Sequence, residues 1–186
     1  MNKAFFLDRD GVINVETGYL HEVDRTVVLD NIWQAIKMIH DHGFLAIAVT
    51  NQAGVAKGYY PESDIQPVHA AIQRQLLAAG GIDALIDGWY YCPHHPEFTG
   101  KCDCRKPGAG MLKRAAADFD IDLSASFMIG DRISDLGAGV NAGCAGECLV
   151  LTGYGEKVRE EAGAAGFPIA ADLPAAVKKM LEISGT

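Results

Sequence analysis

No apolar run in this sequence approaches the length needed to cross a membrane. The N-terminus also lacks a basic segment followed by an apolar stretch, so we expect no secretory signal peptide and a cytoplasmic protein. Positive charge is scarce, because 16 Lys and Arg face 24 Asp and Glu, for a net charge of −8. A protein that binds a nucleic-acid backbone draws its affinity from Lys and Arg. The charge balance therefore disfavours a nucleic-acid partner.

Cysteine is also scarce, and its distribution is uneven. The five cysteines do not resemble a disulfide framework, because three of them crowd with a histidine into one short segment. Such crowding is typical of metal binding in a reducing compartment. Repeats, low-complexity tracts and linkers are missing as well. With 49% hydrophobic and 22% charged residues, the composition indicates one globular domain over residues 1–186.

Apolar runs alternate with amphipathic segments along the chain. We predict buried strands at 4–7, 44–49, 85–91, 126–130 and 149–151, and a short strand near Phe167. We predict helices from a cap at Asp30 to a stop at Gly43, from a capping box at 63–66 to about Ala79, and at 110–119, 134–142 and 173–183. Repeated strand–helix units predict an α/β fold, a doubly wound parallel sheet with helices on both faces. In such sheets the functional site lies beyond the carboxyl ends of the strands.

Two carboxylates stand where the first strand should end, in the string Asp8-Arg9-Asp10-Gly11. Side chains two positions apart leave a strand on the same face, and Gly11 permits an abrupt turn. Such a pair suits a divalent cation together with nucleophilic and acid–base work on a phosphate ester. The alternative is a solvated loop, because short acidic strings of this kind are common.

Polar groups follow the other predicted strands too. Thr50 offers a hydroxyl to a phosphoryl oxygen, although Thr-Asn is also ordinary turn material. After the fourth strand, Asp131 could join Asp8 on a metal ion, and Asp135 could hold Lys106 or cap the next helix. Lys106 lies between the third and fourth strands, from where it can reach the centre of the site. There it would neutralise phosphoryl charge.

Three thiols and an imidazole fall within the thirteen positions from Cys92 to Cys104. Three Cys and one His complete a tetrahedral structural zinc site with no position open for catalysis. We expect Cys92, His94, Cys102 and Cys104 to bind Zn²⁺, with His95 competing for the place of His94. Free buried cysteines are the alternative, but they do not explain two Cys-x-ligand pairs.

The order of these strand-end residues resembles the haloacid dehalogenase superfamily of phosphohydrolases over most of the chain. The resemblance implies that Asp8 attacks phosphorus and forms an aspartyl-phosphate. Asp10 would protonate the leaving alkoxide and then deprotonate the attacking water. Mg²⁺ would bind the Asp8 carboxylate, the Asp10 carbonyl and Asp131. Thr50 and Lys106 would stabilise the transferring group, since phosphoryl transfer needs mainly positioning and charge neutralisation.

The spacing of the motifs leaves no room for a separate cap domain. Between Asp10 and Thr50 there is space for a flap and one helix. Between Thr50 and Lys106 a helix, a strand and the cysteine segment use nearly every residue. We therefore expect an open, capless site in which loops provide specificity.

Several strings narrow the resemblance to phosphatases that remove the 7-phosphate of D-glycero-D-manno-heptose 1,7-bisphosphate. These strings are 7–11, 18–19, 50–52, 91–96 and 102–107. The resemblance implies a bacterial enzyme of nucleotide-activated heptose and lipopolysaccharide biosynthesis, a monomer acting on a small sugar bisphosphate. Arg105 would contact the phosphate that stays on the sugar. The implied substrate-binding residues are Glu16, Thr17, Gly18, Tyr19, Asn51, Gln52, Ala53, Arg105 and Arg132.

Three positions depart from that pattern, namely Val12, Ala53 and Arg132, and the loop between His94 and Cys102 is short. Three other readings compete with it. Ala53 removes a possible hydroxyl contact, and Arg132 alters the reach to the distal phosphate. Histidinol-phosphate phosphatase is the nearest alternative, because it shares the nucleophile, the zinc segment and the CDCRKP string, whereas the flap at 16–22 looks heptose-type. A polynucleotide 3′-phosphatase is disfavoured by the acidic balance. A non-catalytic, zinc-stapled binding domain is disfavoured because all the catalytic motifs are intact.

Overall fold

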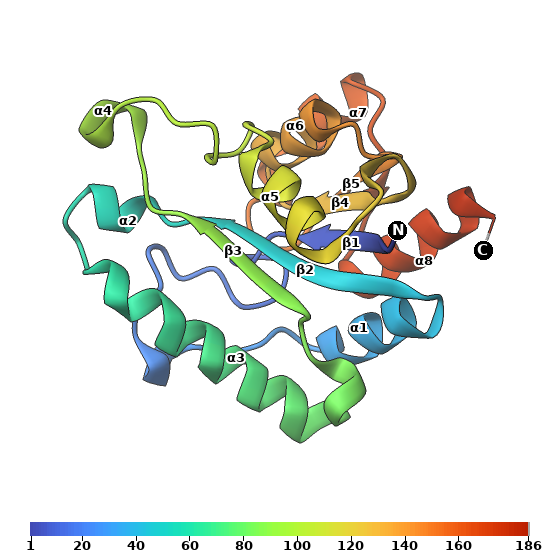
Figure 1. Cartoon of the computed structure of the whole chain (residues 1–186), viewed down its shortest axis with the longest axis horizontal. Coiled ribbons are helices and arrows are strands. Elements are labelled where there is room, and N and C mark those ends of the chain that lie inside the picture. Colours follow the sequence, from blue (N-terminus) through green and yellow to red (C-terminus); the bar gives the residue numbers. More distant parts are fainter. Residues whose placement is uncertain (186) are drawn as a thin grey trace.

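A six-stranded sheet forms the centre of the computed structural model, which describes residues 1–185 (Figure 1). Its strands are β1 (Lys3–Leu7), β2 (Phe44–Asn51), β3 (Gly88–Cys92), β4 (Phe127–Gly130), β5 (Gly146–Val150) and β6 (Ile169–Ala170). They lie in the order β3-β2-β1-β4-β5-β6, and every neighbouring pair is parallel. The predicted doubly wound parallel sheet is therefore confirmed.

Helices cover both faces of this sheet. They are α1 (Ile32–Asp41), α2 (Ala53–Ala56), α3 (Ile65–Gly80), α4 (Pro96–Thr99), α5 (Gly110–Phe119), α6 (Ile133–Ala142), α7 (Gly155–Ala164) and α8 (Leu173–Ser184). Short 3-10 turns lie at Val23–Arg25, Glu62–Asp64, Ile82–Ala84 and Leu123–Ala125. Helices α1, α3 and α8 pack on one face and α5, α6 and α7 on the other (Figure 1). Within residues 1–185, no helix is both long and apolar enough to span a membrane.

Strand β1 is buried on both sides, which explains its continuous apolar run. Phe5 and Leu7 pack in the layer of α1, α3 and α8, whereas Ala4 and Phe6 pack in the layer of α5 and α6. Successive side chains of a strand point to opposite faces, so a strand covered on both faces carries no polar positions. The segments between neighbouring strands hold only the helices and turns named above. The expected capless architecture is thus confirmed.

Three local predictions were wrong. Asp30 does not cap α1, because Asn31 occupies the cap position with a left-handed φ of 63° and no capping side-chain bond. The capping box at 63–66 does not form: the chain enters α3 from a 3-10 turn, and Asp64 already has helical angles rather than the extended ones of an N-cap. The third strand starts at Gly88 instead of 85, because the Gln73 side chain bonds both backbone groups of Ile86.

We predict that Phe5→Ala lowers the free energy of unfolding by about 3–5 kcal/mol, as expected for truncating a buried aromatic side chain. The Phe5 side chain is fully buried, and its ring centroid lies 5.0 Å from that of Phe44 and 5.2 Å from that of Phe127. Denaturant unfolding followed by circular dichroism measures the effect. Leu77→Ala on α3 is the control, because Leu77 is 50% exposed. Equal losses in the two variants would contradict this account of the core.

Candidate functional site

The site lies where the direction of strand addition reverses. After β1, the chain adds β2 and β3 on one side, whereas β4, β5 and β6 extend the sheet on the other. Beyond the carboxyl ends of β1 and β4 lie Asp8 and Asp131, and Asp135 follows in the first turn of α6. Carboxylate oxygens of these three residues all lie within 4.8 Å of one another. Ligand sites of doubly wound sheets are found at this switch point.

Lys106 sits in the middle of these carboxylates. Its Nζ lies 2.7 Å from Asp8 Oδ1 and 2.8 Å from Asp135 Oδ1, and it donates to the Val49 carbonyl at 2.7 Å. Burial acts to lower the pKa of the Lys106 ammonium, but Asp135 and Asp8 outweigh it and hold that pKa above its usual value. The site therefore contains a buried, charged lysine between two carboxylates.

Asp131 is held in a narrow backbone cradle. A Cβ on Gly11 or Gly153, both in left-handed conformation, would collide with the Asp131 carboxylate. The Tyr154 backbone N–H donates to Oδ2 at 2.7 Å, whereas Oδ1 is buried without a hydrogen-bond partner among residues 1–185. Burial raises the pKa of Asp131 to about 7. An underbonded, buried carboxylate beside Asp8 has the donor chemistry that suits a hard divalent cation.

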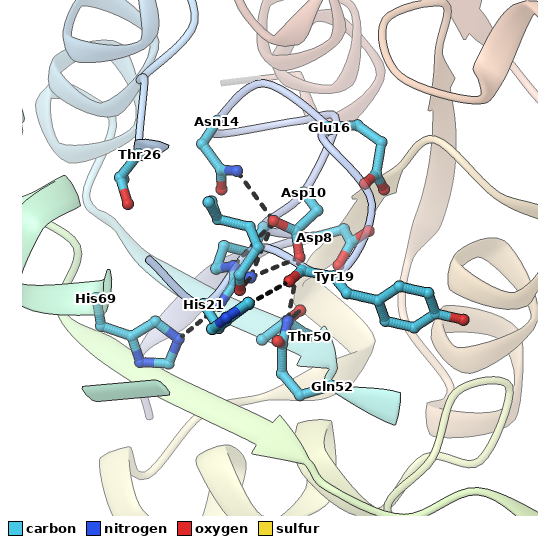
Figure 2. Close-up of polar contacts among 12 residues, drawn as sticks. Asp8, Asp10, Asn14, Glu16, Tyr19, His21, Thr26, Thr50, Gln52 and His69 are labelled. Carbon is cyan, nitrogen blue, oxygen red and sulfur yellow. Dashed lines mark hydrogen bonds and ion pairs between the residues drawn. The ribbon is translucent and has the colours of Figure 1, made fainter. Parts of the chain in front are cut away.

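Asp8 is almost fully buried, and burial raises its pKa well above the usual value although Lys106 opposes the shift. Asp10 has different surroundings (Figure 2). Its carboxylate accepts hydrogen bonds from Arg9 at 2.8 Å, Asn14 at 2.9 Å and Gln52 at 3.1 Å. Gln52 also donates to the Thr50 hydroxyl at 2.8 Å. The Asp10 carboxylate is outside the cluster formed by Asp8, Asp131 and Asp135.

These groups open onto a cavity of about 370 Å³. Its walls include the predicted residues Asp8, Asp10, Glu16, Gly18, Tyr19, Thr50, Asn51, Gln52, Ala53, Arg105, Lys106 and Arg132. Thr17 does not line it: Glu16 accepts a hydrogen bond from the Gly18 N–H at 2.6 Å, and this turn leaves Thr17 exposed at its tip. The substrate contact of Thr17 stays a prediction.

The cavity has further lining residues that the sequence analysis missed. They are Lys57, Tyr60, His95, Ser134, Asp135 and Tyr154. Asp135 had been considered only as a partner of Lys106 or as a cap of the helix start. Lys57 and Tyr60 follow β2 in a stretch to which no element was assigned, and Tyr154 lies just before α7, a helix that was not predicted. The signal available for His95, Ser134, Asp135 and Tyr154 was their position within five residues of the end of a predicted strand, whereas Lys57 and Tyr60 carried no such signal.

Two arginines bring positive charge to the cavity. Arg105 donates from Nη1 to the His94 carbonyl at 3.2 Å, which anchors it to the cysteine segment. The Arg132 guanidinium lies 3.7 Å above the Tyr154 ring and 3.5 Å from a Glu16 carboxylate oxygen. With Lys106 and Lys57, these residues give the cavity four cationic side chains. Four carboxylates, those of Asp8, Asp10, Glu16 and Asp135, line the same cavity. The cationic side chains can pair with the phosphate groups of a ligand, and the carboxylates can hold a divalent cation.

The cysteine segment brings its four predicted ligands together. The Cys104 sulfur lies 2.9 Å from that of Cys92 and 3.4 Å from that of Cys102, and His94 Nδ1 lies 3.4 Å from Cys104. His95 turns away and accepts a hydrogen bond from the Glu97 N–H through Nδ1. Three sulfurs and one imidazole nitrogen within 4.8 Å of one another fit a closed tetrahedral zinc site.

Comparison with known proteins places this geometry in a family. Residues 103–176 match the family model described as HAD-hydrolase-like. The chain is 41% identical over 184 residues to D-glycero-beta-D-manno-heptose-1,7-bisphosphate 7-phosphatase of Escherichia coli K12, covering 95% of this chain and 94% of the relative. The enzyme of that name from Haemophilus influenzae is 39% identical over 186 residues, covering 97% and 99%.

Solved structures agree with these relatives. The crystal structure of D,D-heptose 1,7-bisphosphate phosphatase from B. bronchiseptica, complexed with magnesium and phosphate, superposes with a TM-score of 0.84 at 33% identity, covering 97% of this chain and 99% of that one. The corresponding structure from Burkholderia thailandensis gives a TM-score of 0.69 at 31% identity, covering 96% and 98%. The chain belongs to the haloacid dehalogenase-like hydrolases and, among them, to the D-glycero-beta-D-manno-heptose-1,7-bisphosphate 7-phosphatase family.

Proposed function

We propose that this chain removes the 7-phosphate of D-glycero-β-D-manno-heptose 1,7-bisphosphate and leaves the 1-phosphate in place. The observation that carries the proposal is the convergence of Asp8, Lys106 and Asp131 at the switch point of the sheet, beside a cavity whose lining includes four cationic side chains. The names of the relatives give the substrate, and they favour a heptose bisphosphate over histidinol phosphate. We also propose that the enzyme acts as a monomer in the cytoplasm.

Asp8 is the nucleophile in this proposal. One of its carboxylate oxygens attacks phosphorus, an aspartyl-phosphate forms, and the bond between phosphorus and the sugar oxygen breaks. Lys106, 2.7 Å from Asp8, neutralises charge on the attacking carboxylate and on the phosphoryl oxygens. The Thr50 hydroxyl shares the Gln52 side-chain amide with Asp10 as a hydrogen-bond partner, and it binds an oxygen of the phosphoryl group.

Asp10 is the general acid and then the general base in this proposal. Its carboxyl group gives a proton to the departing sugar oxygen, and the resulting carboxylate then takes a proton from the water that hydrolyses the aspartyl-phosphate. The carboxylate is 18% exposed and lines the cavity, so a leaving group has access to it. Asp8 and Asp10 thus have separate tasks although they are two residues apart.

Two metal sites fit the residues present. The Asp8 and Asp131 carboxylates and the Asp10 carbonyl would hold Mg²⁺, with Asp135 close by. Bound there, the ion supplies positive charge opposite the phosphoryl oxygens. Cys92, His94, Cys102 and Cys104 would hold Zn²⁺, which leaves no free position for chemistry. The zinc site then serves to fix Arg105 and Lys106, which directly follow Cys104.

Asp8→Asn should lower turnover by several orders of magnitude and leave the fold intact. An amide is a poor nucleophile and a weaker metal ligand than a carboxylate. Phosphate release from the heptose bisphosphate with Mg²⁺ measures the effect, and circular dichroism checks the fold. Asp24→Asn, at an exposed position in the turn Val23–Arg25, is the matched control. Retention of more than about a tenth of the wild-type rate, roughly 1.4 kcal/mol of barrier, would remove Asp8 from this role.

Purified protein should contain close to one zinc per chain, and Cys102→Ser should lower both the zinc content and the activity. Loss of one thiolate opens the tetrahedral site, and the segment that carries Arg105 and Lys106 loses its anchor. Elemental analysis and the phosphatase assay make the two measurements on the same sample. Cys144→Ser is the control, because Cys144 lies outside the four-residue cluster. Zinc-free protein with full activity would contradict a structural zinc.

Arg105→Ala should raise KM for the heptose bisphosphate far more than KM for a sugar monophosphate. A guanidinium can pair bidentately with the phosphate that remains on the sugar, and a monophosphate offers no such group. Steady-state kinetics on the two substrates measure the difference. Arg114→Ala, on the exposed side of α5, is the control. If the kcat/KM of the wild-type protein on histidinol phosphate equals or exceeds its kcat/KM on the heptose bisphosphate, the substrate assignment is overturned.

A further inference from the structure

Arg9 is a fully buried cation between the two catalytic aspartates in sequence, and the proposed mechanism leaves it without a task. Its guanidinium contacts three separate segments. Nη2 donates to both carboxylate oxygens of Asp10, at 2.9 and 2.8 Å, and to the Leu20 carbonyl at 3.3 Å. Nη1 lies 3.5 Å from Nε2 of His69 on α3. The arginine therefore joins Asp10, the flap around residues 16–22 and a core helix.

The contact with His69 fixes the state of that histidine. A guanidinium has only donors, so Nε2 must accept and the ring proton must sit on Nδ1. Burial and Arg9 lower the pKa of His69 to about 3, which keeps the ring neutral. The ring stacks on Trp89 with centroids 4.3 Å apart. Its Nδ1 is buried without a hydrogen-bond partner among the described residues.

The buried Nδ1 distinguishes His69 from an apolar core residue. Leaving a buried donor unsatisfied costs about 1–3 kcal/mol, and an apolar side chain at this core position would avoid the cost. What an apolar side chain cannot do is accept from Arg9. The His69–Arg9 contact is thus the feature that sets this position apart from its apolar neighbours on α3, Val68 and Ile72.

A second route joins the flap to the same carboxylate. The His21 ring stacks on Tyr60 with an interplanar angle of 5°, and the Tyr60 hydroxyl donates to Gln52 Oε1 at 2.7 Å. Gln52 in turn donates to Asp10 Oδ2. Figure 2 shows Asp10 surrounded by Asn14, Gln52 and the contacts that lead to His69. Both carboxylate oxygens are held from two sides.

We propose that His69 is a positioning residue: it holds the Arg9 guanidinium, and Arg9 orients the Asp10 carboxyl group toward the leaving oxygen and ties it to the flap. This inference rests on the proposed function, because it takes Asp10 as the proton donor. His69 itself does not touch the substrate, since it is buried and absent from the lining of the cavity.

The proposal predicts different losses of kcat/KM for alkyl and aryl phosphate esters. A sugar oxygen leaves well only when it is protonated, so its departure depends on the orientation of Asp10. A nitrophenolate leaves as an anion and needs no proton. The ratio kcat/KM covers the steps up to release of the leaving group, so it excludes the later hydrolysis of the aspartyl-phosphate. General acid catalysis contributes about 10²–10⁴-fold, and a misdirected acid loses part of that factor.

The test compares His69→Leu with the wild type on an alkyl phosphate that the wild type hydrolyses and on p-nitrophenyl phosphate. We expect kcat/KM for the alkyl ester to fall at least tenfold and kcat/KM for the aryl ester to fall less than threefold. His69→Gln retains an acceptor for Arg9 and should recover most of the alkyl activity. Trp89→Phe is the control, because residue 89 stacks on His69 and does not bond Arg9. It should leave the ratio of the alkyl to the aryl kcat/KM unchanged.

Equal losses on the two esters, no loss on either, or a Gln variant as impaired as the Leu variant would each overturn the positioning role. If His69→Leu does not fold, Arg9→Lys provides the same comparison, because one ammonium cannot hold Asp10, Leu20 and His69 together. Arg9→Lys should then show the alkyl-selective loss, and equal losses would again overturn the role. Wild-type protein that releases no phosphate from the heptose bisphosphate would overturn the proposed function, a result distinct from equal losses in the variants.

Discussion

The Lys106 ammonium, buried between Asp8 and Asp135, is the interaction on which the site depends. Taking one ion out of water costs several kcal/mol, and the cost is recovered only if partners meet it with good geometry. Here the partners come from the end of β1 and the first turn of α6, and the Val49 carbonyl adds a third contact from β2. Because the three groups belong to separate elements, the ammonium is satisfied only in the assembled sheet. The fold and the active arrangement are therefore stabilised by the same contacts.

The position of Lys106 also depends on the cysteine segment that precedes it. Cys92 ends β3, while Cys104 stands two residues before Lys106, so the four-ligand cluster spans the whole connection between strand and lysine. Residues 93–101 contribute no side chain to the buried apolar core. A segment without apolar burial has little to offset its conformational entropy, and a bound metal supplies that missing free energy. Asn51 also stabilises the end of this connection, since its side chain bonds the backbone N–H and C=O of Lys106.

The sequence predicted the features that local patterns encode. Apolar runs located the strands, and polar residues after them located Asp8, Thr50 and Asp131. Helix α7 escaped prediction because only Gly155 and Ala162 are buried along it, which leaves no apolar stripe. The start of β3 was predicted three residues too early, because the Gln73 side chain on α3 bonds the backbone N–H and C=O of Ile86. The Arg9–His69 contact joins residues 60 positions apart on different elements, and only tertiary structure brings them together.

The two aspartates of the first motif show how one short string can carry two opposed tasks. The nucleophile must reach phosphorus and the proton-transfer group must reach the leaving oxygen, so two identical side chains need different surroundings. Asp8 is paired with an ammonium in the buried centre of the sheet edge, close to Asp131 and Asp135. Asp10 turns the other way, toward a guanidinium and two side-chain amides on the flap side. The intervening Arg9 marks the difference between them: its buried guanidinium bonds both oxygens of Asp10, whereas the Lys106 ammonium bonds Asp8, so each carboxylate has its own cation.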